Sequence, residues 1–184
     1  DLITGIMQIH IINLEEANQR REFMIRQMRN LGLPFELFDA IRGSSLSDEY
    51  LASKVDMSEV AKYPHWLTKN MLGASLSHIG VYEKIVNSNE DWHLILEDDV
   101  ALNNDILSLL YHIRENEHIY RDHLVLLYAV SLKGGIELDS NTISMTGSYH
   151  IHKVVSNEIG GGGAYMLHRS TAKRLTEKNR IIKK

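Results

Sequence analysis

Three adjacent carboxylates follow an apolar run in the stretch HLILEDDVALNND. Because side chains alternate along a strand, Glu97 and Asp99 are expected to point to one side and Asp98 to the other. Two carboxylates on one side are a typical site for Mg²⁺ or Mn²⁺, which completes its shell with water and phosphate oxygens. The alternative is that these acids face solvent and precede a helix capped by Asn103 or Asn104.

A second group of polar side chains shares one face of a predicted helix over residues 68–88. The apolar stripe of this helix is expected at Leu72, Leu76, Ile79 and Val86. At 100° per residue, a sector beside the stripe holds Met71, Ser75, His78 and Tyr82. These residues could line a pocket, or they could be hydrogen-bonded at the edge of the core. A Ser–His pair at i and i+3, here Ser75 and His78, is not a hydrolase triad, and the chain has no G-x-S-x-G motif.

Three further features could contact a ligand. The glycines of Ile159–Tyr165 allow a backbone to approach a ligand closely, or they form a flexible turn. Arg20 and Arg21 could reach the phosphates of a nucleotide, or they could be exposed. His150 and His152 would share a strand face, but without a third ligand nearby they do not predict a metal site.

The elements that position these residues alternate between strand and helix. Strands are predicted at 7–14, 35–38, 93–97, 123–130 and 149–155. Helices are predicted before Gly32, at 46–54, at 68–88, after Asn103 and at the end of the chain, whereas 133–148 is expected to be turn-rich. This order predicts an α/β fold with a mostly parallel central sheet flanked by helices. Ligands bind beyond the carboxyl ends of such strands, which brings Asn13–Leu14, Asp39 and Glu97–Asp99 to one rim.

Composition narrows the class of protein. The chain has 184 residues, which predicts a single domain over 7–184, with residues 1–6 set apart as a candidate cloning remnant. There is no cysteine, hence no disulfide and no thiolate zinc site. The net charge of −4 argues against nucleic-acid binding. Between Arg169 and Lys184 there are seven basic residues and a single acid, Glu177, which indicates either a solvated helix end or a surface for anionic lipid or acidic glycan.

Four segments, in this order along the chain, resemble glycosyltransferase family 25, which contains bacterial lipooligosaccharide galactosyltransferases and related collagen galactosyltransferases. The first joins Ile12-Asn13-Leu14 to Arg20-Arg21 and to the turn Phe38–Gly43. The second is LTKNMLGASLSHIGVYEKI, the third is LILEDDV and the fourth is GGGAYMLHRSTAKRL. Each is weak alone, but the ordered set is specific.

The resemblance implies a GT-A-like nucleotide-binding fold and transfer of galactose from UDP-galactose, with inversion, to a lipooligosaccharide or LPS glycan acceptor. It implies Mn²⁺ or Mg²⁺ held by Asp99 and Glu97. The donor-binding residues it implies are Asn13, Leu14, Arg21, Asp39, Ser75, His78, Asp98, Gly162 and Gly163. Glu158, before the glycines, is the candidate general base.

The same resemblance predicts a cytoplasmic protein, peripheral on the inner face of the inner membrane, which contacts lipid through the basic segment 169–184. Members of the family usually continue beyond the position that corresponds to Lys184, so the chain is expected to be either a naturally shortened relative or a fragment. One alternative function is therefore a non-catalytic relative that binds a nucleotide sugar or a partner protein. Another is a different metal-phosphate enzyme on an α/β sheet.

Overall fold

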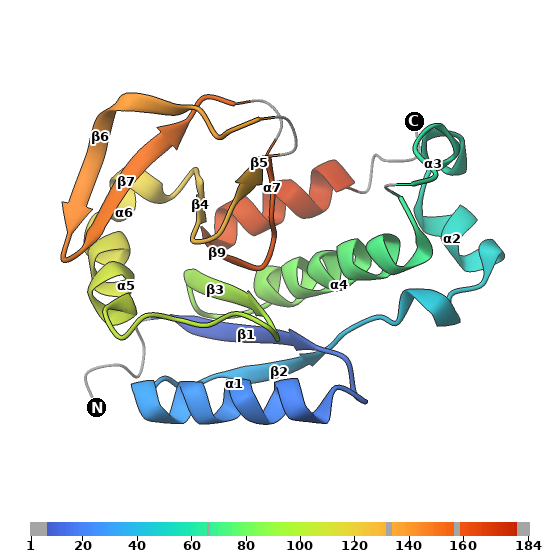
Figure 1. Ribbon diagram of the computed structural model, residues 1–184, viewed down its shortest axis with the longest axis horizontal. Coiled ribbons are helices and arrows are strands. Elements are labelled where there is room, and N and C mark those ends of the chain that lie inside the picture. The colour runs from blue at the N-terminus through green and yellow to red at the C-terminus, as the bar shows by residue number, and fades with distance from the viewer. Residues whose placement is uncertain (1–6, 66, 132–133, 157–158, 180–184) are drawn as a thin grey trace.

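The central sheet of the computed structural model has five strands, in the order β2-β1-β3-β9-β4 (Figure 1). The structure describes residues 7–65, 67–131, 134–156 and 159–179. The strands are β1 (Gln8–Asn13), β2 (Glu36–Asp39), β3 (Trp92–Glu97), β4 (Leu124–Leu126) and β9 (Ala164–His168). β1 is parallel to β2 and β3, while β9 is antiparallel to both of its neighbours. Four strands thus run one way and only β9 runs the other, which confirms the predicted α/β class with a mostly parallel sheet.

Helices cover both faces of this sheet. The four that pack on it are α1 (Asn18–Leu31), α4 (Lys69–Val86), α5 (Ile106–Glu115) and α7 (Arg169–Asn179). In β3, Leu94 and Leu96 enter one core cluster with residues of α1 and α5, whereas Ile95 enters the other with residues of α4 and α7. The alternation of side chains along each strand therefore produces a three-layer arrangement with two apolar cores.

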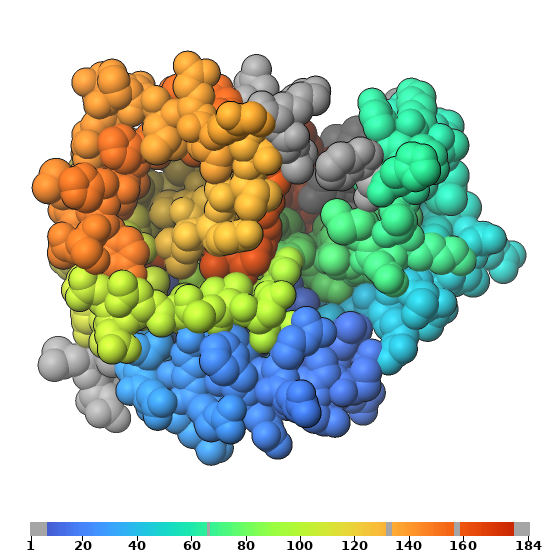
Figure 2. All heavy atoms as spheres, in the orientation of Figure 1, coloured from blue at the N-terminus to red at the C-terminus, as the bar shows by residue number. Residues whose placement is uncertain are grey.

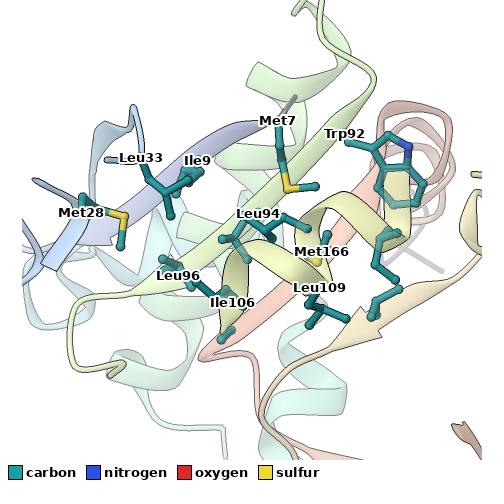
Figure 3. Packing of buried hydrophobic residues seen from close by; sticks show 14 of the residues in the cluster. Met7, Ile9, Met28, Leu33, Trp92, Leu94, Leu96, Ile106, Leu109 and Met166 are labelled. Carbon is teal, nitrogen blue, oxygen red and sulfur yellow. The ribbon is translucent and has the colours of Figure 1, made fainter. Parts of the chain in front are cut away.

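The larger core lies under α1 and α5. Met28 comes from α1, Ile106 and Leu109 come from α5, and all three pack against strand residues such as Leu94 and Met166 (Figure 3). Ile9, Leu94 and Met166 are no more than 1% exposed. This packing fixes β1 and β3 side by side, and their carboxyl ends carry the residues singled out above.

The buried face of α4 differs from the predicted stripe. Its buried residues are Leu72, Gly73, Ser77, Val81 and Ile85, whereas Leu76 and Ile79 are only partly buried. The reason is backbone contact: a Cβ on Gly73 would lie 2.6 Å from the Ile41 carbonyl oxygen. α4 therefore packs its small residues against the chain that follows β2, and this close approach overrides the apolar period.

The segment predicted as turn-rich is mostly strand. Its described part contains β6 (Leu138–Thr146), which pairs with β7 (Tyr149–Val154) as an antiparallel hairpin apart from the central sheet (Figure 1). The expected fifth strand therefore exists, but it belongs to this hairpin. The predicted strand 123–130 is interrupted, because β4 covers only Leu124–Leu126 and Val130 begins the separate short strand β5. The helix cap was also wrong, since α5 begins at Ile106 after Asp105, and Asn103 accepts hydrogen bonds within the preceding turn.

The remaining elements are short connections. They are η1 (Gly43–Ser45), α2 (Asp48–Lys54), α3 (Met57–Lys62), α6 (Glu117–Tyr120), β5 (Val130–Ser131) and β8 (Ile159–Gly160). No helix in the described ranges is both long enough and apolar enough to cross a bilayer.

Two histidines on the neighbouring strands β1 and β3 are buried side by side. His10 and His93 are fully buried, and the Nε2 of His10 lies 3.0 Å from the Nδ1 of His93. His93 also contacts the Glu90 carbonyl oxygen at 3.0 Å. Burial lowers the pKa of His93 to about 4 and lowers the pKa of His10 as well. Both rings are therefore neutral in the folded protein at neutral pH.

These histidines predict a loss of stability in mild acid. The unfolded chain takes up protons at both histidines near the ordinary pKa of 6.5, whereas the folded chain takes one up at His93 only near pH 4. The free energy of unfolding should therefore fall as the pH is lowered from about 7 to about 5, before most carboxylates titrate. Urea denaturation should show a shallower fall for His93→Gln, and an unchanged fall for the exposed control His65→Gln. An equal slope in His93→Gln would contradict this assignment.

Candidate functional site

The carboxyl ends of three parallel strands meet at one rim of the sheet. Asn13 of β1 is in register with Asp39 of β2, and Ile12 is in register with Glu97 of β3. Asp98 and Asp99 form the turn directly after β3. The predicted acidic and amide residues are therefore brought to the same edge by parallel pairing.

A buried network joins the ends of β1 and β3 to α1. The Asn13 side chain is 1% exposed and donates from Nδ2 to Asp98 Oδ2 at 2.6 Å. Its Oδ1 accepts from Arg21 Nε at 2.8 Å. The Arg20 guanidinium lies 2.8 Å from Asp98 Oδ1. Both oxygens of the buried Asp98 are thus occupied, which satisfies its charge and holds the turn after β3 in place.

A second series of polar contacts leads from Glu97 into the smaller apolar core, which lies under α4 and α7. His78 Nε2 lies 3.2 Å from Glu97 Oε1, and His78 Nδ1 lies 2.7 Å from the Tyr165 hydroxyl. The Tyr165 hydroxyl in turn donates to the Tyr82 hydroxyl at 2.9 Å. The hydrogen bond from His78 lowers the pKa of Glu97, so this carboxylate is held ionised and oriented.

Two cavities meet at Glu97, which lines both. The first has a volume of about 400 Å³ and lies between the end of β1, the chain after β2, and α4. The second has a volume of about 580 Å³ and lies between the turn after β3 and the glycine loop. In Figure 2 the surface is hollowed between the yellow-green segment that follows β3 and the green helix α4.

The carboxylates at this junction have different surroundings. Asp99 is exposed and lines the second cavity together with Glu97, whereas Asp98 lines the first cavity and is fully engaged. Among the described residues, no three His, Cys, Asp or Glu side chains come together as a metal site. Mg²⁺ and Mn²⁺ at phosphate sites often need only one or two carboxylates beside substrate oxygens and water. Glu97 and Asp99 fit that kind of site, and Asp98 does not.

The structure brings most of the predicted donor residues to the two cavities. Leu14, His78 and Asp98 line the first cavity, and Gly162 and Gly163 line the second. Asn13 and Arg21 line neither cavity; Asn13 donates to Asp98, and Arg21 donates to Asn13.

Two predicted residues lie elsewhere. Asp39 is exposed on the rim, outside the lining of both cavities. Ser75 is exposed and its hydroxyl donates to the Met71 carbonyl oxygen, so it does not reach the cavity. Glu158 lies outside the described residues.

The sequence reading missed several residues of the first cavity. Ser77, rather than Ser75, faces it, and its hydroxyl accepts from the Ile41 backbone NH at 2.8 Å. Arg42 and Gly43 follow β2 and also line it. The spacing of Gly73 and Ser77 could have indicated this face of the helix. Residues at i and i+4 lie on the same face, and two small side chains there leave room for another backbone to approach.

The basic segment is partly neutralised within the protein. Arg169 lies 3.0 Å from Asp91, and Arg174 lies 2.8 Å from Asp122. Lys173 and Lys178 are exposed on α7. The free positive charge on the described part of this segment is thus smaller than the sequence count indicates.

Comparison with known proteins adds independent information. The model of glycosyltransferase family 25 (LPS biosynthesis protein) matches residues 6–183. The chain is 36% identical over 101 residues to a "Glycosyltransferase 25 family member" of Aedes aegypti. This match covers 52% of this chain and 16% of that protein. It is 26% identical over 116 residues to "Procollagen galactosyltransferase 2" of Homo sapiens, which covers 61% of this chain and 18% of that protein.

A bacterial relative matches over a longer stretch. "Lipooligosaccharide biosynthesis protein lic2B" of Haemophilus influenzae is 26% identical over 169 residues, which covers 91% of this chain and 61% of that protein. The chain therefore spans less than two thirds of the length of each of these relatives.

Proposed function

Because the chain belongs to glycosyltransferase family 25, we propose that it binds a nucleotide-sugar donor and transfers the sugar to a glycan acceptor. The single observation that carries this proposal beyond family membership is the meeting of two cavities at the ionised Glu97. A glycosyl transfer needs a donor and an acceptor on either side of the bond that changes. Two cavities that share the polar residue Glu97 provide that arrangement.

The donor we propose is UDP-galactose, and the acceptor is a lipooligosaccharide or LPS glycan. The names of two relatives support these choices: one is a procollagen galactosyltransferase and the other is a lipooligosaccharide biosynthesis protein. We assign the donor to the first cavity, because nucleotides bind beyond the carboxyl ends of parallel strands. The acceptor then lies in the second cavity, against Gly162 and Gly163. The family resemblance further implies inversion at the anomeric carbon.

The chemistry proposed for this site is stabilisation of the leaving diphosphate. Negative charge grows on the diphosphate as the glycosidic bond breaks. Glu97 lines both cavities and Asp99 lines the second, so together they would hold Mn²⁺ or Mg²⁺ where the cavities meet, and the cation would supply compensating charge. His78 orients Glu97, while Asn13 and Arg20 hold the turn that carries Asp99. A general base must accept the proton of the acceptor hydroxyl, and Glu158 remains our candidate.

For location, we propose a cytoplasmic protein that touches the inner face of the membrane. The support is the chemistry of the acceptor and the exposed Lys173 and Lys178 on α7, which could lie against anionic lipid. The ion pairs of Arg169 and Arg174 limit this attraction.

Thermal unfolding with UDP tests the proposed donor site. At a UDP concentration about 100 times the dissociation constant, we expect the melting temperature to rise by about 5–10 °C in the presence of Mn²⁺. EDTA should remove most of this rise, because the phosphates then lose the cation. A rise that is the same with EDTA would argue against the metal assignment.

The same preparation separates active and inactive alternatives. Transfer of labelled galactose to a lipooligosaccharide acceptor would support the enzyme. Binding of UDP without hydrolysis of UDP-galactose or transfer would support the alternative, a relative that only binds the nucleotide sugar or a partner. Absence of any UDP effect would reject both the enzyme and a relative that binds the nucleotide sugar.

A further inference from the structure

Two arginines line the first cavity, and each is paired with a carboxylate. Arg20 is paired with Asp98, and Arg42 is paired with Glu16. The wall of the cavity also carries Glu97. Two guanidinium groups therefore face three carboxylates, which is an unfavourable balance for a nucleoside diphosphate. Beyond the cation proposed at Glu97, an entering diphosphate would gain from any guanidinium that is released from its carboxylate.

The two ion pairs differ in how easily they can change partners. Asp98 is 8% exposed and also accepts from Asn13, so removing Arg20 would leave a buried carboxylate without its cation. Arg42 and Glu16 are 51% and 48% exposed, so water can solvate Glu16 if Arg42 turns away. An exposed ion pair contributes little to stability. Arg42 is therefore the guanidinium that can be released.

The backbone below Arg42 is fixed. Its carbonyl oxygen accepts from the Ser45 NH at 3.1 Å and from the Ser45 hydroxyl at 2.8 Å. The next residue, Gly43, packs so closely on α4 that a Cβ there would overlap the Lys69 carbonyl. The half-exposed guanidinium of Arg42 is thus attached to a fixed backbone at the edge of the cavity, which limits the entropy lost when it binds an anion.

Resting on the proposed donor site, we propose that Arg42 is a phosphate-binding residue and that Glu16 occupies it until a nucleoside diphosphate displaces the carboxylate. Glu16 then acts as a competitor of the donor. An arginine suits this exchange because its planar guanidinium binds carboxylate and phosphate with the same two-pronged geometry. The proposal gives the two residues opposite effects on donor affinity.

Isothermal titration of the full chain with UDP in fixed Mn²⁺ tests this exchange. Glu16→Gln should bind UDP about two- to fivefold more tightly, because an exposed pair no longer has to be broken. Arg42→Gln should bind UDP about tenfold more weakly, because a charge-assisted hydrogen bond to phosphate is lost. Uridine, which has no phosphate, should bind both variants as it binds the unaltered protein.

Matched controls separate an exchange of partners from a change of net charge. Glu15→Gln removes the same charge from the neighbouring residue, which is exposed and does not line the cavity, and it should leave UDP affinity unchanged. In the Arg42→Gln background, Glu16→Gln should no longer tighten binding. Tightening of equal size in both backgrounds, or in Glu15→Gln, would overturn the proposal. If the unaltered protein bound no UDP, the proposed function itself would fail; binding that Glu16→Gln leaves unchanged would reject only this inference.

Discussion

Replacement of Asp99 by alanine is expected to abolish the Mn²⁺-dependent part of UDP binding. Asp99 is exposed and shares the second cavity with Glu97, so it can offer its carboxylate to a cation. Its removal should lower the affinity for UDP in Mn²⁺ by about 10- to 100-fold, by analogy with the loss of groups that support bound metals. Affinity in EDTA should stay the same. Titration calorimetry with UDP, in Mn²⁺ and in EDTA, measures both quantities.

The control for this variant is Glu115→Ala on α5. This residue is exposed and lies outside the lining of both cavities, so its removal changes the net charge equally without touching the site. Both variants should melt close to the unaltered protein, since exposed substitutions seldom change stability by more than about 0.5 kcal/mol. If Asp99→Ala kept its Mn²⁺-dependent UDP binding, the carboxylates after β3 would serve only to shape the turn.

Replacement of Gly73 by alanine is expected to damage both stability and donor binding. The added Cβ would lie 2.6 Å from the Ile41 carbonyl oxygen and 2.6 Å from the Gly43 nitrogen, and these are backbone atoms. The helix must then move away from the chain after β2, at a cost of about 1–3 kcal/mol that exceeds the helix propensity of alanine. Ala40, Ile41 and Gly43 line the first cavity, so UDP affinity should fall with stability. Urea denaturation and UDP titration measure the two effects.

Gly80→Ala on the same helix is the matched control. A Cβ at Gly80 would meet the tip of the Phe38 ring at 2.8 Å, and a side chain gives way more readily than a backbone. This variant should lose less stability and should keep its UDP affinity, because neither residue lines the first cavity. Equal losses in the two variants would mean that the packing of α4 on Ile41 and Gly43 does not shape the donor site.

The strands and helices of the central layer could be predicted because they are locally consistent. The apolar runs that became β1 and β3 carry continuous buried residues, and α1 ends at Gly32, whose φ of 66° suits glycine. The hairpin β6–β7 was not predicted, because the Asn, Gly and Ser residues of 133–148 favour turns. The pairing of β6 with β7 depends on contacts between the two segments, and these contacts cannot be read from the sequence of either segment alone.

The candidate site divides in the same way. An acidic motif follows one predicted buried strand, and an amide residue ends another. This was sufficient to predict that the two groups meet at one rim of the sheet, and the structure places Asn13, Glu97 and Asp98 there. Ser75 was predicted in place of Ser77, because the helical wheel was oriented by its apolar stripe. The actual orientation follows from Gly73 and Ser77, whose small side chains admit the backbone of Ile41 and Gly43.

The sequence by itself determined the α/β class, the rim at which the carboxylates gather and the resemblance to a glycosyltransferase family, because strand order and motif order are properties of the chain read in one direction. Only the tertiary structure decided which carboxylate is free. Asp98 and Asp99 are neighbours of identical type, yet one is buried between Asn13 and Arg20 while the other is exposed to a cavity. The pairing of Arg42 with Glu16 could not be predicted from the sequence either, because these residues meet only when the chain after β2 lies beside the end of β1. Charge partners are set by distance in space, and that distance is a product of packing.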